Sequence, residues 1–335
     1  MISTEIRPII AITMGDPVGI GPEIIPKALV ESSVYEACRP LVLGDVAVIT
    51  AASERLNTGL RVHSVDSPED GIYQQGDINV IGLSDLDFSR LQHGHPTRET
   101  GRAMVAYINQ AIDWAMEGRV QGLATCPINK VALRMAGVDF DGHTELLAER
   151  TKTSDYVMML AGSRLRVALV TIHLPLAQVP GKLTTETVYK TIRITDHALR
   201  SAFGIPKPQL AVAGLNPHAG EDGLFGDEEI QIISRAVDTA VKAGIDVSGP
   251  HPPDTVFYRA LKGQWDAVVC MYHDQGLIPF KMVHFFDGVN VTLGLPIVRT
   301  SVDHGTAYDI AGTGKADPGS LVAAIQMAAE LSGNR

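Results

Sequence analysis

The stretch Trp265–Gly276, which reads WDAVVCMYHDQG, determines how the rest of the chain is interpreted. The run from Trp265 to Met271 is apolar except for one aspartate, which predicts a short strand buried on both faces of a sheet. His273 and Asp274 follow where this strand ends. In an open α/β sheet, ligands bind just beyond the carboxyl ends of the strands. We therefore expect the chemistry of the protein at this position.

Two other histidines occupy the same place relative to a predicted strand. The run 166–172 ends at His173, and the run 209–215 is followed by NPHAG, which contains His218. If these strands are parallel neighbours, three imidazoles meet at one edge of the sheet. Three histidines with an open fourth position are typical of a catalytic metal site, and they suit zinc or another divalent ion. The alternative is three separate histidines, each hydrogen-bonded at its own strand end.

Length and charge limit the class of protein. A chain of 335 residues exceeds a typical domain of about 100 to 200 residues, so we expect two domains or one large α/β unit. The net charge of -10 argues against nucleic acid or an anionic membrane as a partner. No apolar stretch reaches the roughly 18 residues of a membrane span, and residues 1–5 do not resemble a secretory signal. Three scattered cysteines do not form a disulfide framework. We expect a cytoplasmic protein.

Strand and helix patterns alternate along the chain, which predicts a parallel sheet with helices on both faces. The expected elements include strands over 8–14, 40–44 and 121–125, a helix through Leu56 capped by Asp45, a helix over 97–117, and a helix capped by Asp227 that directs Ile230, Ile233 and Val237 inward.

The first strand runs into GDPVGIGPE, residues 15–23. Its glycines allow a ligand to approach the backbone, Pro22 suits a first helical turn, and the helix N-terminus favours an anion. The spacing matches neither the GxGxxG dinucleotide motif nor a Walker loop. A plain strand-to-helix turn explains the stretch equally well.

Several polar residues are candidates for binding an anion. His143 and Thr144 lie near a predicted helix start and would present donors to a phosphate or carboxylate, although capping by Asp141 or Thr144 is the alternative. Asn290 and Arg299 flank the apolar run 291–298, and the arginine offers a bidentate fork.

Two further residues follow predicted turns. Asp254, in the extended polar turn HPPDT at 251–255, is a candidate for the metal or its surroundings, and Lys281 follows the His273 strand through a short loop. A solvated surface is the usual position of a lysine or arginine, so each of them alone indicates little.

Five motifs together resemble those of the 4-hydroxythreonine-4-phosphate dehydrogenase family, and they cover nearly the whole chain: Met14–Glu23, Gly142–Leu146, Asn216–Glu221, Met271–Gly276 and Thr300–Ala307. The resemblance implies an isocitrate/isopropylmalate dehydrogenase-like fold, with two α/β/α domains and a cleft between them. It also implies a homodimer whose metal site takes ligands from both subunits. We expect residues 1–129 with 303–335 to form the cofactor domain, and residues 130–302 to carry the metal, the substrate and the dimer interface.

The resemblance also assigns roles to residues. It implies that the metal, Zn, Mg or Co, is bound by His173, His218 and His273. It implies that the substrate is bound by His143, Thr144, Lys281, Asn290 and Arg299. The loop 304–312 is similar to the adenosine-side loop of isopropylmalate dehydrogenases, which implies binding of NAD or NADP by His304, Gly305, Thr306, Asp309 and Ile310.

The implied reaction is oxidation of a secondary alcohol β to a carboxylate, with hydride transfer to NAD and loss of CO2. The metal would lower the pKa of the hydroxyl group. We expect conversion of 4-hydroxythreonine 4-phosphate to 3-amino-2-oxopropyl phosphate. Three residues remain candidates for accepting the alcohol proton: Asp254, Asp274 and Lys281.

Other substrates and activities stay open. The stretches 223–229, 252–257 and 287–290 look closer to a paralogous branch that acts on 4-phospho-D-threonate or 4-phospho-D-erythronate. A further family member oxidises an aromatic dihydrodiol carboxylate, which lacks a phosphate. From other classes, a metal-dependent hydrolase or lyase of a phosphorylated acid would use the same histidines, and so would a non-catalytic metabolite-binding protein with a structural metal.

Overall fold

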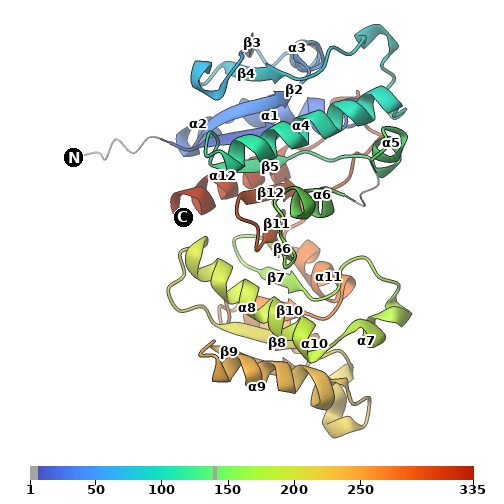
Figure 1. The fold of residues 1–335 in the computed structure, drawn as a ribbon, viewed down its shortest axis with the longest axis vertical. Helices are drawn as coiled ribbons and strands as arrows, with labels where there is room; N and C mark the ends of the chain where they lie inside the picture. The colour runs from blue at the N-terminus through green and yellow to red at the C-terminus, as the bar shows by residue number, and fades with distance from the viewer. Residues whose placement is uncertain (1–6, 139–141) are drawn as a thin grey trace, which may run out of the picture. The chain divides into compact units, whose positions relative to one another are not determined.

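The computed structural model describes residues 7–138 and 142–335, which divide into two compact units (Figure 1). The first unit comprises Met1–Ser154 and Leu295–Gly333, and the second comprises Asp155–Gly294 and Asn334–Arg335. The domains expected from the sequence change at 129/130 and 302/303, so the two divisions assign residues 130–154, 295–302 and 334–335 differently.

The first unit contains a parallel sheet in the strand order β3-β4-β2-β1-β5-β12. Its strands are β1 Ile9–Thr13, β2 Arg39–Gly44, β3 Arg61–Ser64, β4 Asp77–Gly82, β5 Gly122–Thr125 and β12 Val298–Val302. The central strand β1 is buried along its whole length, as expected for a strand covered on both faces.

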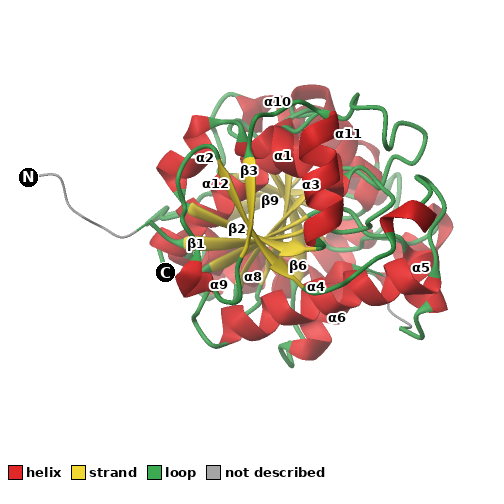
Figure 2. Ribbon diagram, turned by 90° about the horizontal axis from the view of Figure 1, so that it is seen from above, coloured by secondary structure: helices red, strands yellow, loops and turns green. Residues whose placement is uncertain are grey.

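The helices of the first unit cover both faces of its sheet. They are α1 Gly21–Leu29, α2 Ser32–Ala37, α3 Val46–Arg55, α4 Arg98–Met116, α5 Lys130–Met135, α6 His143–Arg150 and α12 Gly319–Gly333, with short 3-10 turns at Pro68–Asp70 and Phe88–Arg90. Figure 2 shows α1 and α3 on one face of the strands and α4 on the other. The predicted cap of α3 is confirmed, because the Val48 amide donates to Asp45 Oδ1 at 3.1 Å.

The second unit contains a mixed sheet in the order β11-β6-β7-β10-β8-β9. Its strands are β6 Val157–Ala161, β7 Arg166–Leu169, β8 Leu210–Ala213, β9 Val247–His251, β10 Ala267–Cys270 and β11 Val289–Leu293. The strands β7, β10, β8 and β9 are parallel, whereas β6 is antiparallel to both β7 and β11. The expectation of a wholly parallel sheet is therefore wrong for β6 and β11.

The helices of the second unit are α7 Val179–Lys182, α8 Thr185–Ser201, α9 Ser234–Lys242, α10 Pro253–Leu261 and α11 His273–Val283, with 3-10 turns at Leu176–Gln178 and Pro217–Gly223. In Figure 2, α10 and α11 lie on one face of the strands and α8 and α9 on the other. Side chains from β7, β8 and β10 form the core with Phe257 and Phe280 from α10 and α11.

A π-helical turn, Glu229–Ile233, precedes α9 and corrects one prediction. Ile233 and Val237 are buried as expected, but Ile230 is exposed. Ile230 lies within this π turn, which is wider than an α turn and therefore directs its side chains differently from a regular α-helix.

Candidate active site

The three histidine-bearing segments follow neighbouring strands. β10 pairs in parallel with β7 on one side and with β8 on the other, so their carboxyl ends lie at the same edge of the sheet. The parallel arrangement on which the metal-site hypothesis depended is confirmed. This edge is where ligands bind in open α/β sheets.

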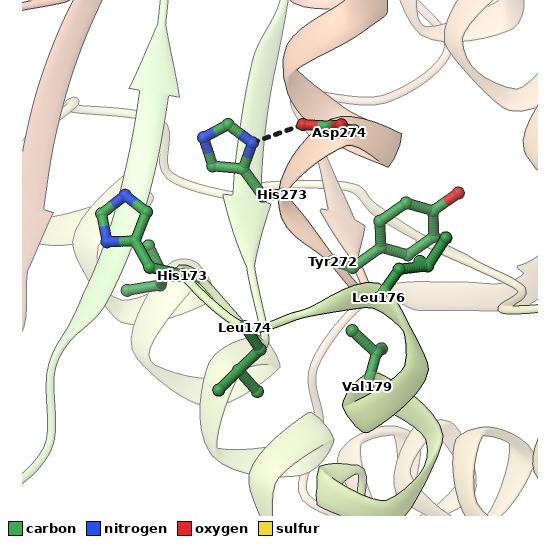
Figure 3. A pocket seen from close by; sticks show the side chains of 8 residues that line it. His173, Leu174, Leu176, Val179, Tyr272, His273 and Asp274 are labelled. Carbon is green, nitrogen blue, oxygen red and sulfur yellow. Dashed lines mark hydrogen bonds and ion pairs between the residues drawn. The ribbon is translucent and has the colours of Figure 1, made fainter.

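A pocket of about 470 Å³ lies at this edge, between the ends of β7 and β10 (Figure 3). Its polar lining consists of His173, Tyr272, His273 and Asp274, and its apolar lining consists of Ile172, Leu174, Leu176 and Val179. The ring centroids of His173 and His273 are 5.7 Å apart. An apolar pocket with a few converging polar groups is the usual form of a small-molecule site.

His273 is held in one orientation by its neighbour. Its Nδ1–H donates to Asp274 Oδ1 at 2.6 Å, the dashed line in Figure 3. Because a carboxylate only accepts, Nδ1 carries the proton of this hydrogen bond, and Nε2 is the ring nitrogen that is left to face a metal. A carboxylate that fixes the tautomer of a histidine in this way is a regular feature of metal-binding imidazoles.

His218 lies in an unusual left-handed turn. His218, Ala219, Gly220, Glu221 and Asp222 have φ angles of 53°, 54°, 83°, 43° and 54°. Left-handed conformation costs a non-glycine residue about 1–2 kcal/mol, so four of these five residues are strained. Such strain persists only where the surroundings impose it, and it is concentrated at functional sites.

The structure does not bring all three histidines together within one chain. Among residues 7–138 and 142–335, no three His, Cys, Asp or Glu side chains are grouped closely enough to hold a metal ion. His173 and His273 are neighbours, whereas the ring of His218 faces Phe225 at a centroid distance of 6.1 Å. The three-histidine site remains a prediction.

Asp254 and Lys281 both lie on helices. Asp254 is exposed in the first turn of α10, where an extended turn was expected, because Pro253 begins the helix instead of preventing it. Lys281 is half-buried on α11, not beyond a loop, and its Nζ lies 5.9 Å from the ring centroid of Phe285.

Asn290 lies on β11, and its Oδ1 is buried. No residue in the described part of the chain donates a hydrogen bond to this oxygen. A buried acceptor without a donor destabilises the fold. A bound ligand that donates a hydrogen bond to this oxygen would remove that cost.

Within the first unit, Arg299 on β12 and His143 at the start of α6 form a buried polar pair. Arg299 is 2% exposed and donates from Nη2 to Thr125 Oγ1 at 2.8 Å. Burial lowers the pKa of Arg299 to about 10, an effect opposed by the charge of Glu145. Burial, and then the charge of Arg299, lower the pKa of His143 well below 6.5. At neutral pH the guanidinium is therefore charged and the imidazole neutral.

The start of α6 confirms the predicted position of His143 and Thr144, with Thr144 half-buried. The N-cap residue of α6 is Gly142, and no side chain caps it. Capping by Thr144 is therefore wrong, and Asp141 lies outside the described residues. His143 Nε2 is buried and has no hydrogen-bond partner among those residues.

The loop that carries the predicted cofactor residues is held by α1 and the turn before it. Tyr308 donates to the buried carboxylate of Asp16, and the amide of Ile20 donates to the Thr306 carbonyl at 3.1 Å. Farther along, Glu23 Oε2 accepts from the Gly314 amide at 3.0 Å.

Sequence reasoning missed these contacts, although GDPVGIGPE was the signal. The predicted cofactor residues themselves are half-buried or exposed: His304, Gly305, Thr306, Asp309 and Ile310. The role of the GDPVGIGPE turn in this structure is to anchor their loop.

The α/β fold and the histidine-lined pocket at the strand ends define a small-molecule enzyme. Residues 36–328 match the pyridoxal phosphate biosynthetic protein PdxA. A 4-hydroxythreonine-4-phosphate dehydrogenase of Desulforapulum autotrophicum is 59% identical over 97% of this chain and 96% of its own. The chain belongs to the PdxA family.

Two more comparisons bear on the assignment. A crystal structure of 4-hydroxythreonine-4-phosphate dehydrogenase from Klebsiella pneumoniae has a TM-score of 0.91 and 43% identity, covering 98% of this chain and 99% of its own. A protein of Symbiobacterium thermophilum, provisionally named D-threonate 4-phosphate dehydrogenase, is 47% identical over 98% of both chains. The predicted family and enzyme class, an oxidoreductase, are confirmed. In the described part of the chain, no helix has the length and apolar character needed to span a bilayer.

Proposed function

We propose that this protein oxidises and decarboxylates a phosphorylated 3-hydroxy acid with NAD and a divalent metal, converting 4-hydroxythreonine 4-phosphate to 3-amino-2-oxopropyl phosphate. The names of its relatives support this substrate class. We infer an isocitrate/isopropylmalate dehydrogenase-like fold, with NAD bound along the loop 304–312, because that loop resembles the adenosine-side loop of those enzymes.

The observation that carries the proposal is the buried pair of Arg299 and His143. A guanidinium with a pKa of about 10 stays charged at neutral pH, and its planar fork matches a carboxylate or phosphate. The free Nε2 of His143 and the buried Oδ1 of Asn290 would complete the hydrogen bonds of the substrate. Thr144 and Lys281 are the remaining residues that we assign to its anionic groups.

The histidines of the second unit fit a divalent metal. Asp274 orients His273 with Nε2 available, and the His173 ring lies beside it. We assign His173, His218 and His273 as the ligands. When bound, the metal would lower the pKa of the substrate hydroxyl and favour loss of CO2. Asp274 is engaged with His273, which leaves Asp254 and Lys281 as candidates for accepting the alcohol proton.

We also infer a homodimer that completes the metal site, because the described residues of one chain do not bring three ligands together. A row of exposed apolar side chains on and after α11 supports this inference: Ile278, Met282, Phe285 and Phe286. Large apolar residues exposed side by side indicate a protein interface.

The test is NADH formation with 4-hydroxythreonine 4-phosphate, 4-phospho-D-threonate and 4-phospho-D-erythronate in parallel, each with and without a chelator. We expect chelator-sensitive turnover that is fastest with the amino acid. A preference for a phosphorylated aldonate would instead establish the second candidate, which the relative from Symbiobacterium thermophilum favours. Release of phosphate without NADH would favour a hydrolase and contradict the proposal.

A further inference from the structure

A hydrogen bond fixes the chain two residues before each of the three histidines. Thr171, Asn216 and Met271 lie two residues before His173, His218 and His273, respectively. Each of these three residues takes part in a buried or half-buried hydrogen bond that crosses from one strand end to the next or closes the loop. The pattern connects the ends of β7, β10 and β8 in the order in which they lie in the sheet.

The first tie joins β7 to β10. The Thr171 hydroxyl donates to the Met271 carbonyl at 2.7 Å, and the Thr171 amide donates to the same oxygen at 3.2 Å. Thr171 is buried. The spacing between the segments that lead to His173 and His273 is therefore fixed by two bonds to one atom.

The second tie joins β10 to β8. Gln275 is buried in the first turn of α11, and its Oε1 accepts from the Met271 amide at 2.6 Å. Its Nε2 donates to the Gly214 carbonyl at 2.6 Å. One side-chain amide therefore bridges the segments that lead to His273 and His218.

The third tie closes the loop that carries His218. Glu229 is 2% exposed, and its Oε1 accepts from the amides of Leu215 and Asn216, both at 2.7 Å. Its Oε2 accepts from Asn216 Nδ2 at 2.9 Å. A Cβ added to Gly220 would lie 2.7 Å from Oε2, so this glycine lets the left-handed turn approach the carboxylate.

We propose that Thr171, Gln275 and Glu229 are positioning residues for the metal site. Together they hold three strand ends in register and impose the strained turn, so that each subunit holds its own histidines in a fixed position for the site that the dimer completes. Each of the three side chains bonds to backbone groups and would act on the cation only through the histidines. The inference rests on the proposed function, because it takes the histidines to be ligands. Mutation of residues that orient metal ligands typically lowers metal affinity about 10- to 100-fold.

The test uses the full-length chain, freed of metal with a chelator and titrated with Co²⁺, whose visible absorption reports its coordination. Glu229→Gln removes the negative charge and turns one acceptor atom into a donor that faces Asn216 Nδ2. We expect Co²⁺ affinity to fall about 10- to 100-fold, with weaker absorption bands. Excess Co²⁺ should restore kcat, because the ligands themselves are intact.

The matched control is Glu228→Gln, the same change at the neighbouring position. Glu228 Oε2 accepts from the side chain of Asn216 at 2.8 Å, and among residues 7–138 and 142–335 no backbone amide of the loop donates to it. We expect it to change Co²⁺ affinity by less than about threefold, within the spread of surface substitutions. Thr171→Val is a second, milder variant, because valine has nearly the shape of threonine and the change removes one hydrogen bond. If Glu229→Gln does not fold, the Co²⁺ titration is made with Thr171→Val instead.

Different results would contradict the positioning role of these residues and the proposed metal site itself. Lower thermal stability with unchanged Co²⁺ affinity and spectrum, in the variants that fold, would mean that the three residues are only structural. That result would overturn the inference and leave the metal site intact. If the unmodified chain bound no Co²⁺, or if His173→Ala bound it equally well, the proposed metal site would be wrong and the inference would fall with it.

Discussion

Arg299 is almost fully buried on β12, and with a pKa of about 10 its guanidinium is charged at neutral pH, so it can bind an anionic group of the substrate through two parallel hydrogen bonds. We expect Arg299→Lys to raise the KM for the phosphorylated substrate about 10- to 100-fold, because lysine loses the bidentate fork and hydrogen bonds to charged groups contribute about 1.5–3 kcal/mol. Steady-state kinetics check this. Arg90→Lys, on an exposed turn, is the control, and an unchanged KM in Arg299→Lys would remove Arg299 from the substrate site.

His143 gives a pH dependence with a definite sign. Its pKa is well below 6.5 in the folded protein, so below pH 6.5 the unfolded chain binds a proton that the folded chain does not. Folding stability is thus unaffected above that pH and falls as the solution is acidified. When the pH falls from about 7.5 to about 5.5, the free energy of unfolding of the unmodified protein should decrease by about 1 kcal/mol more than that of His143→Gln. Urea unfolding at both pH values measures this difference, and equal losses would contradict it.

The histidines at the strand ends could be predicted from the sequence. The residues that hold those strand ends in place through hydrogen bonds could not. His173, His218 and His273 each follow an apolar run, and such a run marks a strand end without any structure. Glu229 and Gln275 bond to backbone groups that lie 13 and 61 residues away in the chain, and no local pattern signals such partners. The resemblance assigned ligands, but it did not assign what orients them.

At the scale of elements, proline explains two wrong predictions. Pro279 lies inside α11, although a proline often ends a helix, so the segment before Lys281 is helical and not the short loop that was expected. Pro253 and its neighbour suggested extended chain at Asp254, but proline fits the first turn of a helix. Of the residues 218–223, all of which have positive φ, only Gly220 and Gly223 are glycines, so the conformation of this turn depends on tertiary contacts.

The packing of α4 on α5 leads to a stability prediction. A Cβ added to Gly101 would lie 2.0 Å from the backbone oxygen of Ala132, and backbone yields less easily than a side chain. We expect Gly101→Ala to lower the free energy of unfolding by about 1–3 kcal/mol despite the better helix propensity of alanine. Gly333→Ala, at the exposed end of α12, meets nothing within 4 Å and should be neutral or slightly stabilising. Thermal unfolding compares the two, and equal melting temperatures would refute the clash.

At the scale of the molecule, strand direction was the part of the sheet that the sequence did not reveal. The runs Val157–Ala161 and Val289–Leu293 are almost fully buried, as β7 is, but they pair antiparallel. Direction depends on the connections, and β6 reaches β7 through a short link that needs no crossover helix. Alternation of strands and helices predicted the α/β class correctly, because that pattern is set by side-chain periodicity alone.

The exposed apolar side chains around α11 lead to a prediction about assembly. Met282 is 83% exposed, lies one turn from Ile278, and is followed by Phe285 and Phe286. If this surface joins two subunits, Met282→Glu places a charge in an apolar interface, which should shift sedimentation from dimer to monomer. Turnover and Co²⁺ binding should fall together with the dimer, because the proposed metal site needs both subunits. Met116→Glu, the same change at an exposed methionine of the first unit, should leave both unchanged. An active monomer of Met282→Glu would show that one chain assembles the site alone.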